Sequence, residues 1–380
     1  MNKQPYFDDS YEARLKRQMS NLRWRLLHID PVLVLSLLAL SIFGLFILYS
    51  ASDENVRALE FQGLHLGISF LLMLVFAQIS PQRYQQWAPY LYSAGVFLLL
   101  LVLIAGHVHQ GGKRWLEFAG MRLQPTELMK LAMPMMLAWF LSQKILPPSN
   151  KTCFYSVIIL LLPVILTAKQ PDLGTAIIIA CSGFSVLLLA GIRWRLIAYL
   201  FTGMLLCTPL IWHSMHAYQR NRVLTFLNPE SDPLGNGYHI IQSKIAIGSG
   251  GVFGKGWLHG TQSHLSFLPE HTTDFIFSVS GEELGLFGAI AIILLFCIIF
   301  VRMLYMSSQA QSSFNRLLAG SIAFTFILSA FVNMAMVLGL LPVVGVPLPL
   351  ISYGGSYMIT TFIGFGIIMS IYTHKKLWSS

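Results

Sequence analysis

Long apolar stretches separated by short polar turns dominate this chain from residue 31 onward. A stretch of about 17–25 apolar residues is long enough to cross a bilayer as a helix. By this criterion the pattern predicts ten spans, near residues 31–50, 64–80, 87–106, 126–143, 153–169, 173–190, 195–213, 275–301, 317–340 and 350–372. We therefore expect an all-α polytopic membrane protein of about ten transmembrane helices, with a large loop between the seventh and eighth spans.

Two of these boundaries stay open at the level of the sequence. Lys169–Thr175 separates the fifth and sixth spans, although one long kinked helix also fits this stretch. Leu317–His374 contains no Asp, Glu, Lys or Arg, yet it is too long for a single span. Its interruption is marked by Pro342, Gly345, Pro347 and Pro349.

Composition points to the same class of protein. Hydrophobic residues make up 55% of the chain and charged residues 11%, and the mean hydropathy is +0.64, which excludes an ordinary water-soluble domain. We expect one transmembrane domain over residues 31–374 with a loop at about 213–273, preceded by a basic segment (1–30) and followed by a short tail (375–380). The basic segment lacks the apolar region and cleavage site of a signal peptide, so we expect it to be retained.

The distribution of Lys and Arg predicts the orientation, because cytoplasmic flanks carry an excess of both. One end of the predicted bundle carries both termini and most of the cations, namely Arg14, Lys16, Arg17, Arg23, Arg25, Arg83, Lys144, Lys151, Arg193, Arg195, Arg302, Arg316, Lys375 and Lys376. The short loops at the other end carry Arg57, Lys113, Arg114, Arg122 and Lys169. Both termini are therefore expected in the cytoplasm and the long loop outside it. The net charge of +9 then reflects topology and attraction to anionic lipid, and it does not indicate nucleic acid.

A glycine-rich run, Gly248–Gly256, lies in this long loop. It fails the P-loop pattern, since Ser249 stands where the first glycine is required and Gly256 where Ser or Thr is required. ATP is also unavailable outside the cytoplasm. A flexible loop is therefore favoured over a phosphate-binding nest beside Lys255.

Asp274 is the leading candidate for chemistry. It stands at the edge of the eighth predicted span, directly after the long polar loop. Because desolvating an ionised carboxylate at the membrane boundary is costly, an acid in this place is a functional-site candidate. N-capping of the helix that begins near Phe275 explains the same residue equally well at this stage.

Cations on the outer side form a second group of candidates, because the positive-inside tendency disfavours them there. They are Lys113 and Arg114, which precede Trp115, together with Arg220, Arg222 and Lys244. Phosphate or pyrophosphate is the natural ligand, since Arg offers a bidentate fork and Lys a point charge. Contact with lipid headgroups, or with Glu230 and Asp232, is the alternative.

Acids inside the predicted spans need partners as well. Glu127 and Lys130 are spaced i,i+3, so they share a helix face and can form an internal ion pair, the polar wall of a cavity, or both. Glu282 and Glu283 cannot share one face, and at least one of them is expected to meet a polar partner inside the bundle. The six histidines of the long loop show no established metal spacing.

Several motifs along nearly the whole chain resemble those of the SEDS family (shape, elongation, division and sporulation). They are Lys113–Leu116, Gln124–Glu127 with Lys130, Gln170–Ala176, Tyr218–Leu227, Asp232–His239, Gln242–Gly251, Leu268–Phe275 and Gly339–Gly355. The sequence of Val343–Pro349 is similar to that of the elongation branch of this family. The sequence departs from the family pattern at Thr126 and at Ser280–Gly281, and neither departure affects a charged residue.

The resemblance implies a glycosyltransferase of the bacterial inner membrane that polymerises peptidoglycan from lipid II. Asp274 matches the family's essential acid and would be the general base. The leaving group would be a lipid pyrophosphate, which departs without protonation if cations stabilise its charge. Candidates for substrate binding are Lys113, Arg114, Trp115, Glu127, Lys130, Arg220, Arg222 and Lys244. No cofactor is certain, and a Mg²⁺ or Mn²⁺ ion bridging the pyrophosphate stays open, because the sequence offers no ready-made cage.

The resemblance also implies partners: lipid II, glycan linked to undecaprenyl pyrophosphate, a class B penicillin-binding protein with transpeptidase activity, and other membrane proteins of the elongation complex. Two alternatives of other classes stay open. A lipid II flippase would also need an outer anion site and a cavity, but it would depend less on Asp274. A non-enzymatic scaffold would need neither the carboxylate nor the outer cations.

Overall fold

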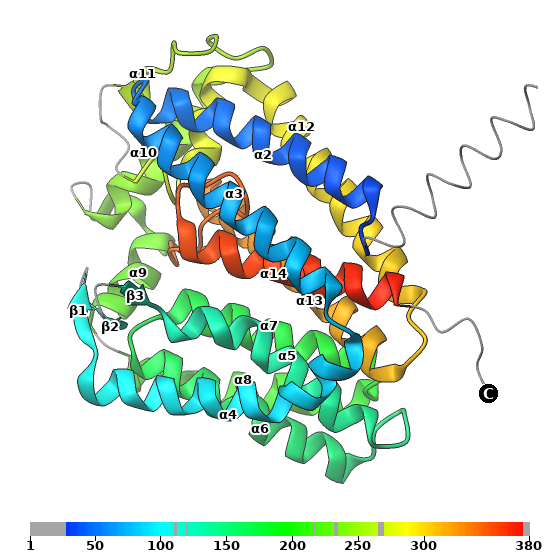
Figure 1. The fold of residues 1–380 in the computed structure, drawn as a ribbon. Helices are drawn as coiled ribbons and strands as arrows, with labels where there is room; N and C mark the ends of the chain where they lie inside the picture. Colours follow the sequence, from blue (N-terminus) through cyan, green and yellow to red (C-terminus); the bar gives the residue numbers. More distant parts are fainter. Residues whose placement is uncertain are drawn as a thin grey trace, which may run out of the picture.

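The computed structural model describes residues 28–374, apart from 110–111, 119–120, 216, 232–234 and 265–269 (Figure 1). A helix stands at each of the ten predicted spans: α2 (Pro31–Ala51), α3 (Val56–Gln78), α4 (Pro81–Ala105), α5 (Pro125–Ser142), α6 (Asn150–Lys169), α7 (Leu173–Leu189), α8 (Trp194–Ser214), α12 (Ile276–Ser308), α13 (Ser313–Val337) and α14 (Gly355–Thr373). The parts of the predictions that concern residues 1–27 and 375–380 lie outside the described residues.

Seven of these helices are long and apolar enough to cross a membrane by length and composition, namely α2, α3, α4, α6, α12, α13 and α14. Helix α7 and the 194–210 part of α8 are apolar but shorter, and α5 carries a charged pair. Ten crossings therefore remain a prediction, whereas the helical, multi-span architecture is observed in the described residues. Both open boundaries are true interruptions, since α6 and α7 are separate helices and α13 and α14 are joined by an extended segment.

A small sheet corrects the all-α expectation. Strands β1 (His107–His109), β2 (Gly112–Phe118) and β3 (Met121–Leu123) form an antiparallel meander in the order β1-β2-β3 between α4 and α5. Strands this short, with charged residues among them, give no clear apolar alternation, so a pattern based on apolar runs passes over them.

The long loop between α8 and α12 is also structured. It contains α9 (Ala217–Leu227), the 3-10 turn η1 (Pro229–Ser231), α10 (Asn236–Gly250) and the single turn α11 (Thr261–His264). In Figure 1 these elements gather at the same end of the bundle as the sheet. This end is the one for which the charge pattern predicts an extracytoplasmic position.

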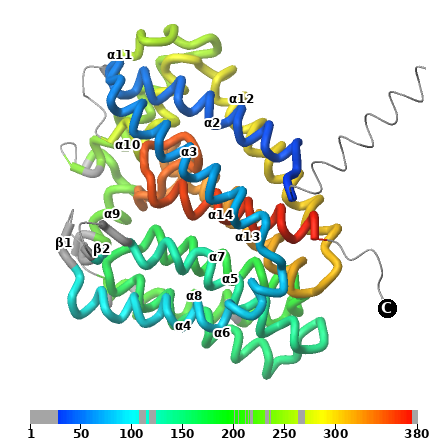
Figure 2. The backbone as a smooth tube through the Cα atoms, in the orientation of Figure 1, coloured from blue at the N-terminus to red at the C-terminus, as the bar shows by residue number. Residues whose placement is uncertain are grey.

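The opposite end of the bundle brings the two ends of the described chain together, as Figure 2 shows for the start of α2 and the end of α14. Asp30, the N-cap of α2, accepts hydrogen bonds from Arg302 of α12, with Nε at 3.0 Å from Oδ1. The His28 ring stacks on His374 at 3.7 Å between ring centroids. Both ends of the described chain therefore lie at one end of the bundle, as an even number of spans requires.

Helix α12 is broken near its outer end. Gly285 has φ +63° and ψ −156°, which only glycine adopts without strain, and it separates residues 276–284 from the rest of the helix. We call residues 276–284 the half-helix and residues 251–262 the strap. The strap supplies the hydrogen bonds that the break removes: the N–H groups of Lys255 and Gly256 donate to the carbonyls of Glu282 and Glu283.

The strap also accepts hydrogen bonds from the residues after the break: the N–H groups of Leu286 and Phe287 donate to the carbonyls of Gly251 and Val252. Four backbone hydrogen bonds therefore join the strap to α12. The expectation of a flexible glycine-rich loop is wrong, because its glycines serve close backbone approach: a Cβ on Gly254 would overlap the carbonyl of Glu283.

Candidate functional site

Asp274 lies in the turn before α12, one residue before the N-cap of that helix, Phe275. The N-cap residue makes no side-chain capping hydrogen bond. The helix begins one residue later than a cap at Asp274 requires, because the N–H of Phe275 donates to the carbonyl of Glu270 and closes the turn. The alternative interpretation of Asp274 as a helix cap is therefore wrong, and its carboxylate is left for another role.

The turn that carries Asp274 is clamped to the extended segment between α13 and α14. Asn333 of α13 donates through Nδ2 to the carbonyl of Asp274 and to that of Val346, both at 2.8 Å. Ser352 donates to the carbonyl of Thr273 at 2.6 Å. The backbone of Asp274 is thus fixed, and only its side chain is free to meet a ligand.

Burial and two charged neighbours set the proton affinity of Asp274. The pKa of its carboxyl is raised to about 6, first by burial and then by the Glu270 carboxylate, while the Arg222 guanidinium acts to lower it. Arg222 lies on α9 and donates through Nη1 to the carbonyl of Val343 at 3.2 Å. A carboxylate whose pKa lies near neutrality is suited to accept a proton in catalysis.

The other cations of the long loop take different places. Lys244 of α10 is exposed and lies over Gly339 in the turn after α13, where a Cβ on the glycine would overlap the end of the lysine side chain. Arg220 of α9 donates to the carbonyls of Trp212 and His213, in the last turn of α8. Arg222 is thus the cation that acts on Asp274, and Arg220 is turned toward α8.

A polar cavity of about 250 Å³ gathers the remaining predicted residues. Its walls come from β2, α5, α7 and the segment that leads into α14, and they include Arg114, Trp115, Glu127 and Lys130. Lys113 lies on β2, and its side chain is outside the described part of the chain. Four of the residues predicted to bind substrate therefore line one cavity, although two of them lie on a strand and two on a helix.

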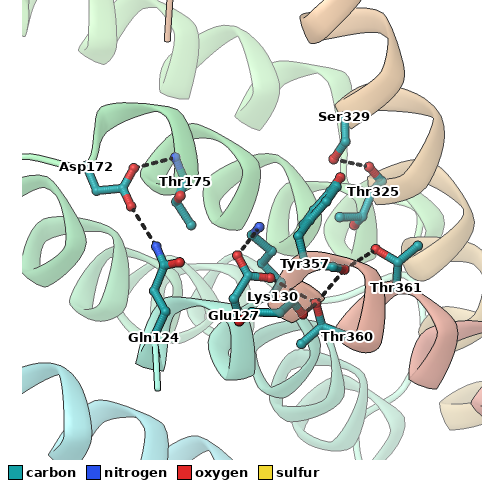
Figure 3. A network of polar contacts seen from close by, with 11 residues as sticks. Gln124, Glu127, Lys130, Asp172, Thr175, Thr325, Ser329, Tyr357, Thr360 and Thr361 are labelled. Atoms are coloured by element: carbon teal, nitrogen blue, oxygen red, sulfur yellow. Dashed lines mark hydrogen bonds and ion pairs between the residues drawn. The ribbon is translucent and has the colours of Figure 1, made fainter. Parts of the chain in front are cut away.

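The ion pair predicted within the fourth span lines this cavity, and Figure 3 shows it among its polar neighbours. Lys130 Nζ donates to Glu127 Oε1 at 2.7 Å, and Thr360 donates to Glu127 Oε2 at 2.9 Å. The Lys130 ammonium also lies 4.2 Å from the ring centroid of Tyr357. Both interpretations of the pair hold, because it is buried and compensated and at the same time lines the cavity.

Among the residues of this cavity that sequence reasoning missed are Gln124, Asp172 and Tyr357. Asp172 caps α7 by accepting from the N–H of Thr175 at 3.2 Å, and its other oxygen accepts from Gln124 Nε2 at 3.4 Å. The polar break before α7 was the available signal for Asp172. For Tyr357 the sequence carried no such signal, since an aromatic residue at the start of an apolar helix is typical of the hydrophobic core.

A single stretch of backbone separates Asp274 from the cavity. Gly345 lines the cavity, and a Cβ built on it would lie 3.5 Å from Asp274 Oδ2. Gly345 has φ +73°, so other residues are disfavoured there. The carboxylate and the polar cavity are therefore neighbouring parts of one candidate site.

An apolar cavity of about 380 Å³ adjoins this site between α3, α4, α5 and α14. It shares Gln124, Glu127 and Ser356 with the polar cavity, and elsewhere it is lined mostly by apolar side chains such as Leu91 and Ile363. A ligand with a charged head and an apolar tail would fit this pair of cavities.

The remaining candidates are the acidic residues of α12 and side chains that could bind a metal ion. Glu282 and Glu283 both have polar partners, as expected: Lys255 donates to Glu282 at 2.6 Å and Ser50 donates to Glu283 at 2.5 Å. In the part of the chain that the structure describes, no group of three or more His, Cys, Asp or Glu side chains could hold a metal ion.

Comparison with known proteins defines the class. The sequence model of the family described as cell cycle protein, FtsW/RodA/SpoVE, matches residues 31–377. Peptidoglycan glycosyltransferase MrdB of Escherichia coli K12 is 48% identical over 94% of this chain and 96% of its own length. A probable peptidoglycan glycosyltransferase FtsW of Trichlorobacter lovleyi is 40% identical over 93% of this chain and 96% of its own.

Solved structures agree with the sequence comparison. The rod shape determining protein RodA of Thermus thermophilus superposes with a TM-score of 0.69 at 27% identity, covering 91% of this chain and 98% of its own. A chain in a solved peptidoglycan synthase complex, described as coordinating polymerization and crosslinking, gives a TM-score of 0.80 at 32% identity over 91% and 99%. The chain belongs to the FtsW/RodA/SpoVE (SEDS) family of multi-pass membrane proteins.

Proposed function

We propose that this protein is a peptidoglycan glycosyltransferase of the bacterial inner membrane that polymerises lipid II into glycan strands during cell elongation, with Asp274 as general base. Its relatives named peptidoglycan glycosyltransferases support the enzyme class. The observation that carries the mechanism is the position of Asp274: its pKa is raised to about 6, and it lies beside Arg222 and next to a polar cavity.

In the proposed step, a sugar hydroxyl attacks the anomeric carbon of a second sugar with inversion. The bond between the hydroxyl oxygen and this carbon forms while the bond from the carbon to the lipid pyrophosphate breaks. The hydroxyl proton passes to the carboxylate of Asp274, and the pyrophosphate leaves with the electron pair. One carboxylate suffices, in contrast to glycoside hydrolysis, because the leaving group needs no proton.

Cations near the carboxylate are proposed to stabilise the pyrophosphate charge as it develops. Arg222 acts on Asp274 and Lys244 lies over Gly339 in the turn after α13, while Arg114 and Lys130 line the polar cavity. Two groups of cations suit a reaction in which both sugars carry lipid pyrophosphates. The apolar cavity would take part of a lipid tail, since its lining is apolar and it adjoins the polar cavity.

We also propose a class B penicillin-binding protein as partner, which would crosslink the new strand. The similarity to a chain from a peptidoglycan synthase complex supports a complex of this kind. The flippase alternative needs the same cavities and cations, and it differs in requiring no general base.

Polymerisation of labelled lipid II by the purified protein tests the proposal, with and without the partner. We expect glycan strands from the wild-type protein and none from Asp274→Asn, while a substitution of the exposed Glu54→Gln, at the same end of the bundle, should leave the rate unchanged. Movement of lipid II across vesicle membranes without polymer formation, and unaffected by Asp274→Asn, would favour the flippase.

A further inference from the structure

The strap is bound to α12 by one side chain above all, Glu282. Its carboxylate is fully buried and accepts from Lys255 Nζ at 2.6 Å, from the N–H and hydroxyl of Thr261 at 2.8 and 2.9 Å, and from the N–H of Gln262 at 3.1 Å. Lys255 keeps 27% of its side chain exposed. A buried carboxylate with this many donors is a firm attachment point for the strap.

The half-helix leads from this attachment point to the turn that carries the proposed base. Every side chain from Ile276 to Glu283 is buried. Helix α10 packs on it so closely that a Cβ on Gly250 would overlap the carbonyl of Gly281. Because Gly285 breaks the helix, the rest of α12 does not fix the orientation of the half-helix through a continuous helical backbone. That orientation rests on α10, on the strap and on the clamped turn at Asp274.

A second attachment ties the strap to α2. Trp257 stacks on Phe46 with 4.5 Å between ring centroids, and its Nε1 donates to the carbonyl of Phe46 at 3.2 Å. Ser50, also on α2, donates to Glu283. The strap therefore bridges α2 and the half-helix, and the chain from Gln262 leads back to Asp274.

We propose that Lys255 and Glu282 are positioning residues: the ion pair locks the strap onto the broken helix and so holds the half-helix in the orientation that presents Asp274 to the substrate. This inference rests on the proposed function only through the role of Asp274. Lys255 touches no reacting atom in this arrangement, and its effect on the reaction is transmitted through Glu282.

The variant Lys255→Met tests this, because it keeps the length of the side chain and removes the charge. A general base misplaced by about 1 Å lowers the rate about 100-fold, so we expect kcat for lipid II polymerisation to fall about 10- to 100-fold. Lys255→Arg should restore most of the rate. The matched control is Lys151→Met, an exposed lysine at the opposite end of the bundle, which should behave as wild type.

The pH profile separates positioning from a simple loss of folded enzyme. Glu270 and Arg222 are the charged groups that act on Asp274. If the half-helix loosens, Asp274 gains solvent, its pKa falls toward the ordinary value, and the acidic limb of kcat moves to lower pH. A smaller folded fraction would lower the amplitude and leave the limb in place, and that result would overturn the proposal.

Hydrogen–deuterium exchange provides a second readout that needs no activity. We expect faster exchange in Lys255→Met at the amides of Gly256 and Leu286 and along the half-helix, and unchanged exchange in Lys151→Met. Unchanged exchange in Lys255→Met would overturn the proposal even if wild type is inactive, so its failure is distinguishable from failure of the proposed function. If Lys255→Met does not accumulate, Thr261→Val removes one donor to Glu282 and should show the same changes to a smaller degree.

Discussion

Replacing Asp274 with Asn removes the proposed base while keeping the size of the side chain. The amide cannot accept the proton, so the loss of general-base catalysis should lower the polymerisation rate by about 10² to 10⁴. Because the structure assigns the N-cap to Phe275, loss of a helix cap adds nothing to the effect. Abundance and partner binding should match the wild-type protein.

The same substitution should lower activity but raise the stability of the folded protein at neutral and alkaline pH. Raising the pKa of a carboxyl from 3.8 to about 6 corresponds to about 3 kcal/mol against the ionised form, and we expect about 1–2 kcal/mol because the side chain keeps some solvent contact. The folded state binds the proton more tightly than the unfolded state. The stability that this provides is therefore complete below about pH 4 and is lost as the pH rises to about 6.

An Asn side chain resembles the protonated carboxyl and avoids this loss. Asp274→Asn should therefore raise the midpoint of thermal unfolding in detergent by about 2 °C at pH 8 and change it little at pH 4. The assay pairs this measurement with polymerisation of labelled lipid II on the same preparations. Retained activity, or a lower midpoint at pH 8, would refute the assignment of Asp274 as a desolvated base.

Other predictions follow from the same geometry. Glu270→Gln should move the acidic limb of activity to lower pH, because a like charge that raises the pKa of the base is gone. Arg222→Gln should raise the lipid II concentration for half-maximal rate, with only partial rescue by Arg222→Lys, since the bidentate fork is lost; unchanged kinetics would return this residue to a lipid-headgroup contact. Lys130→Met should destabilise the protein by about 3–5 kcal/mol, measured by thermal unfolding, because it leaves a buried carboxylate unpaired. Reporter fusions should report cytoplasm at Arg193 and the outer side at Asn236, and a cytoplasmic signal at Asn236 would contradict the access of lipid-linked substrate to the base.

The helices could be predicted because a bilayer leaves no other way to pair the backbone, so apolar runs and helices coincide. The exceptions lie where helices extend into polar sequence. Helix α3 begins at Val56 rather than near residue 64, and the added turns contain Arg57 and Glu60. Hydropathy cannot mark such turns, because they lie at the edge of the apolar region.

The charged residues of the candidate site could be predicted from the sequence. Glu127, Lys130 and Asp274 stand out because apolar spans tolerate few ions. The break in α12 was not predictable, since Gly281, Gly285 and Gly288 all lie in the same predicted span and only Gly285 has a positive φ. The strap residues that bond to the break at Gly285 lie about 30 positions earlier in the chain, and no local pattern connects the two segments.

The break in α12 has a consequence for how the protein enters the membrane. The part of the helix after Gly285, residues 286–308, is apolar apart from Arg302, Ser307 and Ser308 near its inner end and is alone long enough to cross a hydrocarbon core about 30 Å thick. The insertion machinery can therefore release this part into lipid while Glu282 and Glu283 remain in water. The half-helix would then enter the bundle later, when Ser50 and Lys255 are in place to receive the two acids.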